Sequence, residues 1–134
     1  MTAAQPRETG LADAIRAGAA GLHALEAACD LVIGAGWPHR DDFSSFVSTV
    51  TSTTDGATEL AHIDWQALIS SRDAGRLPCG SGENRILRLA ASIAAGIPVD
   101  LNKALRGLDR SNIALVVRAV RHANGQRPAD QPGF

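Results

Sequence analysis

The stretch LADAIRAGAAGLHALEAACDLV, residues 11–32, carries the longest regular hydrophobic pattern of the chain. Its apolar and small residues step by three and four throughout, as one face of an α-helix requires. These residues are Leu11, Ile15, Gly18, Leu22, Leu25, Cys29 and Val32. The pattern predicts one long helix of roughly six turns, which ends where Gly34, Gly36 and Pro38 follow.

The composition around this stretch is that of a small globular protein. The chain has 134 residues, of which 45% are hydrophobic, 20% charged and 4% aromatic, and this suits a single domain over residues 1–134. No window approaches the roughly 18 apolar residues of a membrane span, and the first ten residues lack the pattern of a signal peptide. Two cysteines are too few for a disulfide framework. We therefore expect a cytoplasmic protein with reduced thiols and no membrane partner.

The charges are distributed unevenly along the chain. Residues 1–75 carry four basic and ten acidic side chains, whereas residues 76–134 carry nine basic and four acidic ones. The overall net charge is only −1. An acidic half (1–75) and a basic half (76–125) either attract each other, within the fold or across a homodimer, or offer a surface to a charged partner such as nucleic acid.

The rest of the acidic half predicts two shorter helices. Phe43, Phe46, Val47 and Val50 have helical spacing, so we expect a helix over 41–50 that frays into a loop among the following serines and threonines. Asp64 is a predicted N-cap for a helix that stops near residue 75.

The basic half predicts three further helices. One runs from Ser81, its expected N-cap, to Gly96, and the others begin at the caps Asp100 and Asp109. The last helix should turn its apolar side chains inward: Ile113, Val116, Val117 and Val120. Residues 126–134 are expected to form a flexible tail. Because no strand pattern is evident, the predicted fold class is all-α: a compact bundle of about six helices, with a long N-terminal helix and a C-terminal three-helix unit.

Three segments carry a resemblance to other proteins: Gly21–Ala28, Leu77–Glu83 and Leu87–Leu101. In these segments the chain resembles a group of uncharacterised actinobacterial proteins, and the likeness covers both halves. The resemblance implies no activity, ligand or catalytic residue, so function has to be argued from the residues themselves.

The loop Pro78–Gly82 precedes a predicted helix N-terminus, where free backbone N–H groups and the helix dipole can bind an anion or lower the pKa of the Cys79 thiol. Its spacing matches neither the phosphate-binding loop nor the nucleophile elbow. Capping by Ser81 explains the loop fully, so we expect no reactive site here.

Other catalytic and metal-binding patterns are also lacking in the sequence. The four histidines, His23, His39, His62 and His122, do not recur at metal-ligand spacing. Most carboxylates are accounted for as caps or in the first turns of helices. We therefore expect no metal site, no cofactor and no enzymatic activity.

The basic half offers a candidate surface for nucleic acid. Three of its four acidic residues lie at predicted helix starts, which leaves Arg85, Arg88, Arg110, Arg118 and Arg121 as exposed positive charge. The pairs spaced by three project together from their helices. A helix-turn-helix is poorly matched, because Pro98 and Val99 lengthen the turn and the following helix is short. The alternative is that these arginines are solvated or pair with the acidic half.

The predicted long helix, about 36 Å in length, offers a second candidate interface. A protein this small cannot easily cover such a helix, so Leu22 and Leu25 are predicted to contact a partner or a second copy of the chain. The leading hypothesis is thus a non-catalytic helical module for protein interaction or self-association, with a homodimer expected. The alternative is a small DNA-binding regulator that uses the arginine surface.

Overall fold

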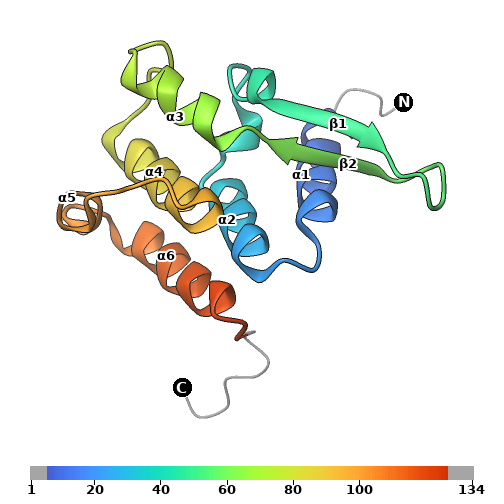
Figure 1. Ribbon diagram of the computed structural model, residues 1–134. Helices are drawn as coiled ribbons and strands as arrows, with labels where there is room; N and C mark the ends of the chain where they lie inside the picture. The colour runs from blue at the N-terminus through green and yellow to red at the C-terminus, as the bar shows by residue number, and fades with distance from the viewer. Residues whose placement is uncertain (1–5, 127–134) are drawn as a thin grey trace.

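The computed structural model describes residues 6–126, and the side chains of residues 10–126. Over this range it contains six α-helices and one β-hairpin (Figure 1). The predicted helical fold is confirmed in part: the fold is mostly helical, with six α-helices, but the hairpin means that it is not purely all-α. The elements are α1 (Pro6–Ala19), α2 (His23–Gly34), β1 (Val47–Thr51), β2 (Glu59–Ile63), α3 (Trp65–Asp73), α4 (Ser81–Ala95), α5 (Leu101–Leu105) and α6 (Arg110–Ala123).

The predicted flexible tail lies outside the described residues, except for Gln126. None of the described helices combines the length and the apolar composition that crossing a membrane requires.

The predicted long helix is broken into α1 and α2. Gly21 lies between them with φ +93°, a left-handed conformation that favours glycine. The Gly21 N–H donates a hydrogen bond to Glu26 Oε2 (2.9 Å), so a side chain of α2 holds the turn. The break lets α1 fold back beside α2, and both helices then bury their apolar stripes in one core. Leu22 sits at the break and is 60% exposed.

The segment predicted as a helix over 41–50 is a short 3₁₀ turn, Ser44–Phe46, followed by strand β1. β1 pairs antiparallel with β2, with Val47 opposite Ile63 and Thr51 opposite Glu59. The serines and threonines at 48–52 favour extended backbone over helix, and this preference prevails once a partner strand is available. The hairpin lies against α1, where the backbone of Ala61 in β2 approaches Gly18 closely.

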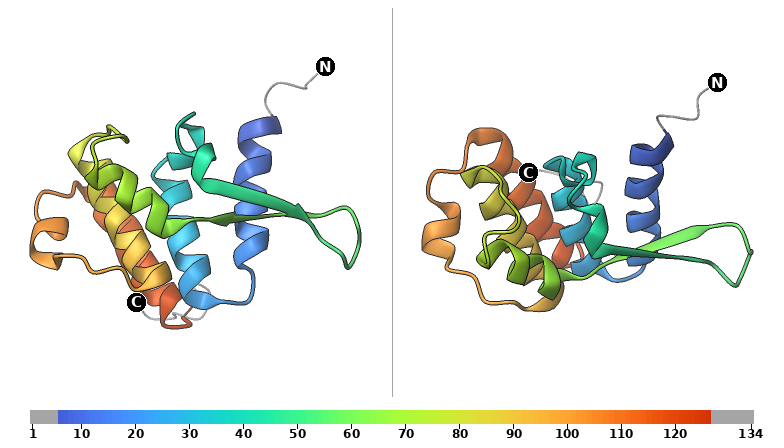
Figure 2. Two further views of the ribbon diagram at one scale, coloured as in Figure 1. Left: turned by 45° about the horizontal axis from the view of Figure 1, so that its top comes forward. Right: turned by 90° about the horizontal axis from the view of Figure 1, so that it is seen from above.

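Helix α2 is the centre of the fold. It contacts α1 on one side and α4 and α6 on the other, as the views of Figure 2 also show. Its buried residues are Ala27, Ala28, Cys29, Leu31 and Val32. Helix α3 packs on α4, and α5 packs on the far side of α4 from α2. One hydrophobic core therefore runs from α1 to α6.

Helix α6 buries only part of its apolar face. Val116 and Ala119 are buried, as expected for Val116. Val117 and Val120 are exposed, so the prediction that they point inward is wrong. The apolar face of α6 is wider than its contact with α2 and α4. The exposed part of this face lies beside α5.

Candidate functional site

An apolar groove runs between α4, α5 and α6. It has a volume of about 440 Å³. Its walls are almost entirely aliphatic, and several of the lining side chains are exposed. The lining residues are Leu89, Ser92, Ile93, Val99, Leu101, Leu105, Ile113, Val116, Val117, Val120 and Arg121. We call this feature the α4–α6 groove.

The α4–α6 groove exists because α5 is too short to cover it. The five residues of α5 bury only Ala104 and leave Leu101 and Leu105 exposed on the rim. Val117 and Val120 form the opposite rim on α6. Four large aliphatic side chains thus remain exposed around one groove, whereas isolated exposed apolar residues are ordinary on protein surfaces.

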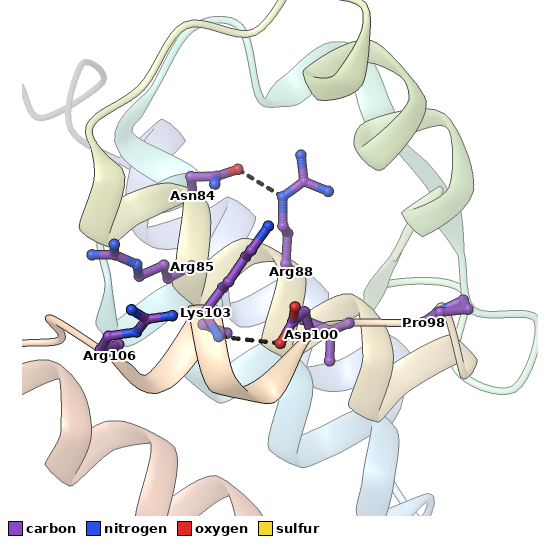
Figure 3. Close-up of a pocket in the computed structure, with 9 residues that line it drawn as sticks. Asn84, Arg85, Arg88, Pro98, Asp100, Lys103 and Arg106 are labelled. Carbon is purple, nitrogen blue, oxygen red and sulfur yellow. Dashed lines mark hydrogen bonds between the residues drawn. The ribbon is translucent and has the colours of Figure 1, made fainter.

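A cationic pocket lies beside the groove, between α4 and α5. It has a volume of about 490 Å³, and four of its lining residues are basic: Arg85, Arg88, Lys103 and Arg106. Figure 3 shows Lys103 extending from α5 toward the side of α4 that carries Asn84 and Arg88. Val99 lines both the pocket and the groove, so the two form one continuous surface.

The cations of this pocket differ in how they are held. Arg88 pairs with Asp73 (Nη2 to Oδ1, 2.6 Å) and also donates from Nε to Asn84 Oδ1 (3.0 Å). The Arg85 guanidinium lies against the backbone of Gly107, where a Cβ would come within 3.0 Å of Nη1.

One carboxylate, Asp100, also lines the pocket, but it accepts a hydrogen bond from the Lys103 N–H as the cap of α5. Within residues 10–126, neither Arg85 nor Lys103 forms an ion pair with a carboxylate. The pocket therefore presents net positive charge to an incoming anionic group.

The five arginines predicted as a nucleic-acid surface do not gather on one surface. Arg85 and Arg88 line the cationic pocket. Arg118 lines a different cavity of about 220 Å³ between α2 and α6, together with Asp30, and Arg121 lies at the edge of the groove. Arg110 is exposed at the first residue of α6. Lys103 and Arg106 join Arg85 and Arg88 instead, which the sequence did not indicate because nothing in the local pattern of α5 relates it to α4.

The two predicted interface leucines have different environments. Leu22 is exposed in the turn between α1 and α2, as a partner contact would require. Leu25 is partly buried and packs on the core, beside Ile15 and Cys29. The groove residues Leu101 and Leu105 were missed, although apolar residues at both ends of so short a helix signal that one face remains uncovered.

Cys79 lies in the loop before α4 and is partly buried. Burial raises the pKa of the Cys79 thiol, an effect that outweighs the nearby Arg72 guanidinium. Ser81 is the first residue of α4 rather than its N-cap, which is Gly80. Glu83 accepts a hydrogen bond from the Gly80 N–H (2.9 Å), so the side chain of Glu83 takes the stabilising role expected of Ser81.

No known protein family, curated protein or solved structure matches this chain.

Proposed function

We propose that the protein is a protein-interaction module that binds an amphipathic helix of a partner. The apolar face of the partner helix would occupy the α4–α6 groove, and its acidic side chains would meet the cationic pocket. The observation that carries this proposal is the set of four large aliphatic side chains exposed around one groove, Leu101, Leu105, Val117 and Val120. Grooves of this kind accept the i, i+3/i+4 and i+7 side chains of a helix.

Shape and charge favour a partner helix over a second copy of the chain or duplex DNA as the occupant of the groove. The groove is concave, so two copies of it do not complement each other, whereas a convex helix does. Four basic side chains line the adjoining pocket. They favour a partner helix that has carboxylates on the side facing α5. Duplex DNA is a poorer match because its backbone has no aliphatic face for the groove.

The proposal is tested with a labelled amphipathic helical peptide that has leucines at i, i+3, i+4 and i+7 and glutamates along one flank. A second peptide replaces each glutamate with lysine. Fluorescence polarisation is measured with both peptides at about 50 and 200 mM salt, because attraction between exposed charges weakens over this range. We expect the acidic peptide to bind the protein at least about tenfold more tightly than the basic one at low salt, a difference of about 1.4 kcal/mol.

The matched variants are Val120→Asp and Val50→Asp. Val120 is 57% exposed in the groove, and Val50 is 54% exposed on the distant hairpin, so both changes place a carboxylate at a similarly exposed site. Val120→Asp should weaken binding of the acidic peptide at least about tenfold, because the docked helix would bury an unpaired carboxylate there. Val50→Asp should leave it unchanged.

Equal binding of the two peptides, or equal loss with the two variants, would refute the proposal. Sedimentation of the protein alone as a dimer that Val120→Asp dissociates would assign the groove to self-association instead. Salt-sensitive binding of random duplex DNA that Val120→Asp does not weaken would favour the DNA-binding alternative.

A further inference from the structure

Two histidines and a glutamate that are distant in the sequence meet at one end of α2 and α6. His23 is the first residue of α2, Glu26 lies one turn further, and His122 is in the last turn of α6. One potential ligand atom from each of the three lies within 4.8 Å of the others. We propose that His23, Glu26 and His122 bind a divalent transition-metal ion, with Zn²⁺ as the best match, and thereby link α2 to α6.

The distances within this group are close to those of a metal site. His122 Nε2 lies 2.9 Å from Glu26 Oε1, and His23 Nδ1 lies 3.7 Å from the same oxygen. Ligand atoms of a tetrahedral Zn²⁺, at about 2.0–2.1 Å from the ion, are about 3.3 Å apart. Small side-chain adjustments therefore suffice to seat the ion. Two histidines and one glutamate form a ligand set that Zn²⁺ accepts, with a fourth position left for water.

The three side chains are also positioned by their surroundings. The second oxygen of Glu26, Oε2, accepts a hydrogen bond from the Gly21 N–H (2.9 Å), which leaves Oε1 for the ion. The edge of the His23 ring formed by Cδ2 and Nε2 lies against Gly125, just after α6. His23 Nδ1 is thereby the ring nitrogen that faces Glu26.

His122 has a carboxylate on its other side. Its Nδ1 lies 3.7 Å from Asp30 Oδ2, and Asp30 in turn accepts a hydrogen bond from Arg16 Nε (3.1 Å). At this distance the carboxylate forms no hydrogen bond with the ring, but its charge favours a proton on Nδ1 and so leaves Nε2 for the ion. The hydrogen bond from Gly21, followed by that from His122, holds the pKa of Glu26 below its usual range.

The test uses the full chain without an affinity tag, freed of metal by a chelator. Zn²⁺ is titrated in competition with a chromophoric chelator, and Co²⁺ is added separately so that the visible absorption of a tetrahedral site is observed directly. We expect one equivalent of Zn²⁺ per chain. His23→Ala and Glu26→Gln should each weaken Zn²⁺ binding at least about tenfold, the loss usual for groups of a metal site. Asp30→Asn should weaken it less than either, because Asp30 only lies near the His122 ring.

His62→Ala is the matched control, because His62 is an exposed histidine on β2, away from the cluster. His62→Ala should bind Zn²⁺ like the natural chain. His23 is largely exposed, so its substitution leaves the fold intact, which circular dichroism checks. Absence of stoichiometric binding by the natural chain, or affinity that His23→Ala and Glu26→Gln leave unchanged, would overturn the proposal.

Discussion

Replacing Gly18 with alanine tests the most demanding contact of the fold, between α1 and the hairpin. A Cβ at Gly18 would lie 2.2 Å from the backbone oxygen of Ala61 and 3.1 Å from its carbonyl carbon. Both atoms belong to strand β2, so no flexible side chain can move aside. Helix α1 or the hairpin must shift, and overpacking of this kind costs about 1–3 kcal/mol.

The helix propensity of alanine acts in the opposite direction. Glycine within a helix is about 1 kcal/mol less favourable than alanine. Because the clash involves backbone, we place its cost near the upper limit, and the net loss for Gly18→Ala is about 2 kcal/mol. Gly10→Ala is the matched control, because Gly10 also lies in α1 and a Cβ added there would meet no other atom within 4 Å. It should gain up to about 1 kcal/mol.

Urea denaturation followed by tryptophan fluorescence measures both changes, since Trp37 and Trp65 are buried and report on the core. With a slope of about 2 kcal/mol/M, Gly18→Ala should lower the midpoint by about 1 M, and Gly10→Ala should raise it slightly. A midpoint for Gly18→Ala at or above that of Gly10→Ala would refute the close approach of α1 and β2.

Three further predictions concern local contacts. Asp109→Ala should lower the free energy of unfolding by about 1 kcal/mol, measured by urea denaturation, because the Asp109 carboxylate accepts the Asn112 N–H (2.8 Å) at the start of α6; an unchanged midpoint would contradict this role. The pKa of Asp55 is lowered to about 2, first by the Thr58 side chain, so its contribution to stability is present above about pH 4 and disappears as the pH falls toward 2; Thr58→Val should raise the Asp55 pKa in an NMR titration, and an unshifted curve would exclude that hydrogen bond. Burial raises the pKa of Cys29 to about 12 and also raises that of Cys79, so a disulfide reagent at neutral pH should react slowly with both thiols until urea unfolds the chain; rapid reaction of Cys79 in the folded protein would show an activated thiol.

Helix starts and stops were the most predictable part of the fold. Asp64, Asp100 and Asp109 each cap the helix expected to follow them, and Gly96 ends α4 in a left-handed conformation. A capping hydrogen bond joins residues only three apart, so the local sequence contains all the information that it needs.

The hairpin and the break at Gly21 depend on distant parts of the chain. Strand β1 forms because β2 pairs with it and α1 packs against the hairpin. Residues 41–51 alone contain no information about either contact. At Gly21 the hydrophobic period continues without interruption, so the pattern alone cannot distinguish one helix from two that pack side by side. The tertiary packing of α1 on α2 and β2 decides between them.

The candidate sites depend on tertiary contacts in the same way. His23 in α2 and His122 in α6 are far apart in the sequence, so no local sequence motif could indicate that they lie close together. Likewise, the arginine pairs of α4 and α6 were predicted to form one surface, but Arg118 lines a cavity between α2 and α6 together with Asp30, whereas Arg85 lines the cationic pocket. Spacing within a helix predicts which residues share its face, but not which neighbour that face meets.

The most direct test of the proposed function is to map the acidic amphipathic peptide on the ¹⁵N-labelled protein by NMR. Docking in the α4–α6 groove predicts that the largest amide shifts occur along α5 and α6, at Leu101, Leu105, Val117 and Val120, with smaller shifts at Arg85 and Lys103. The amide shifts of the hairpin residues should not change. Shifts confined to the hairpin or to the turn around Leu22, or no shifts at peptide concentrations well above that of the protein, would contradict a docking site in the α4–α6 groove.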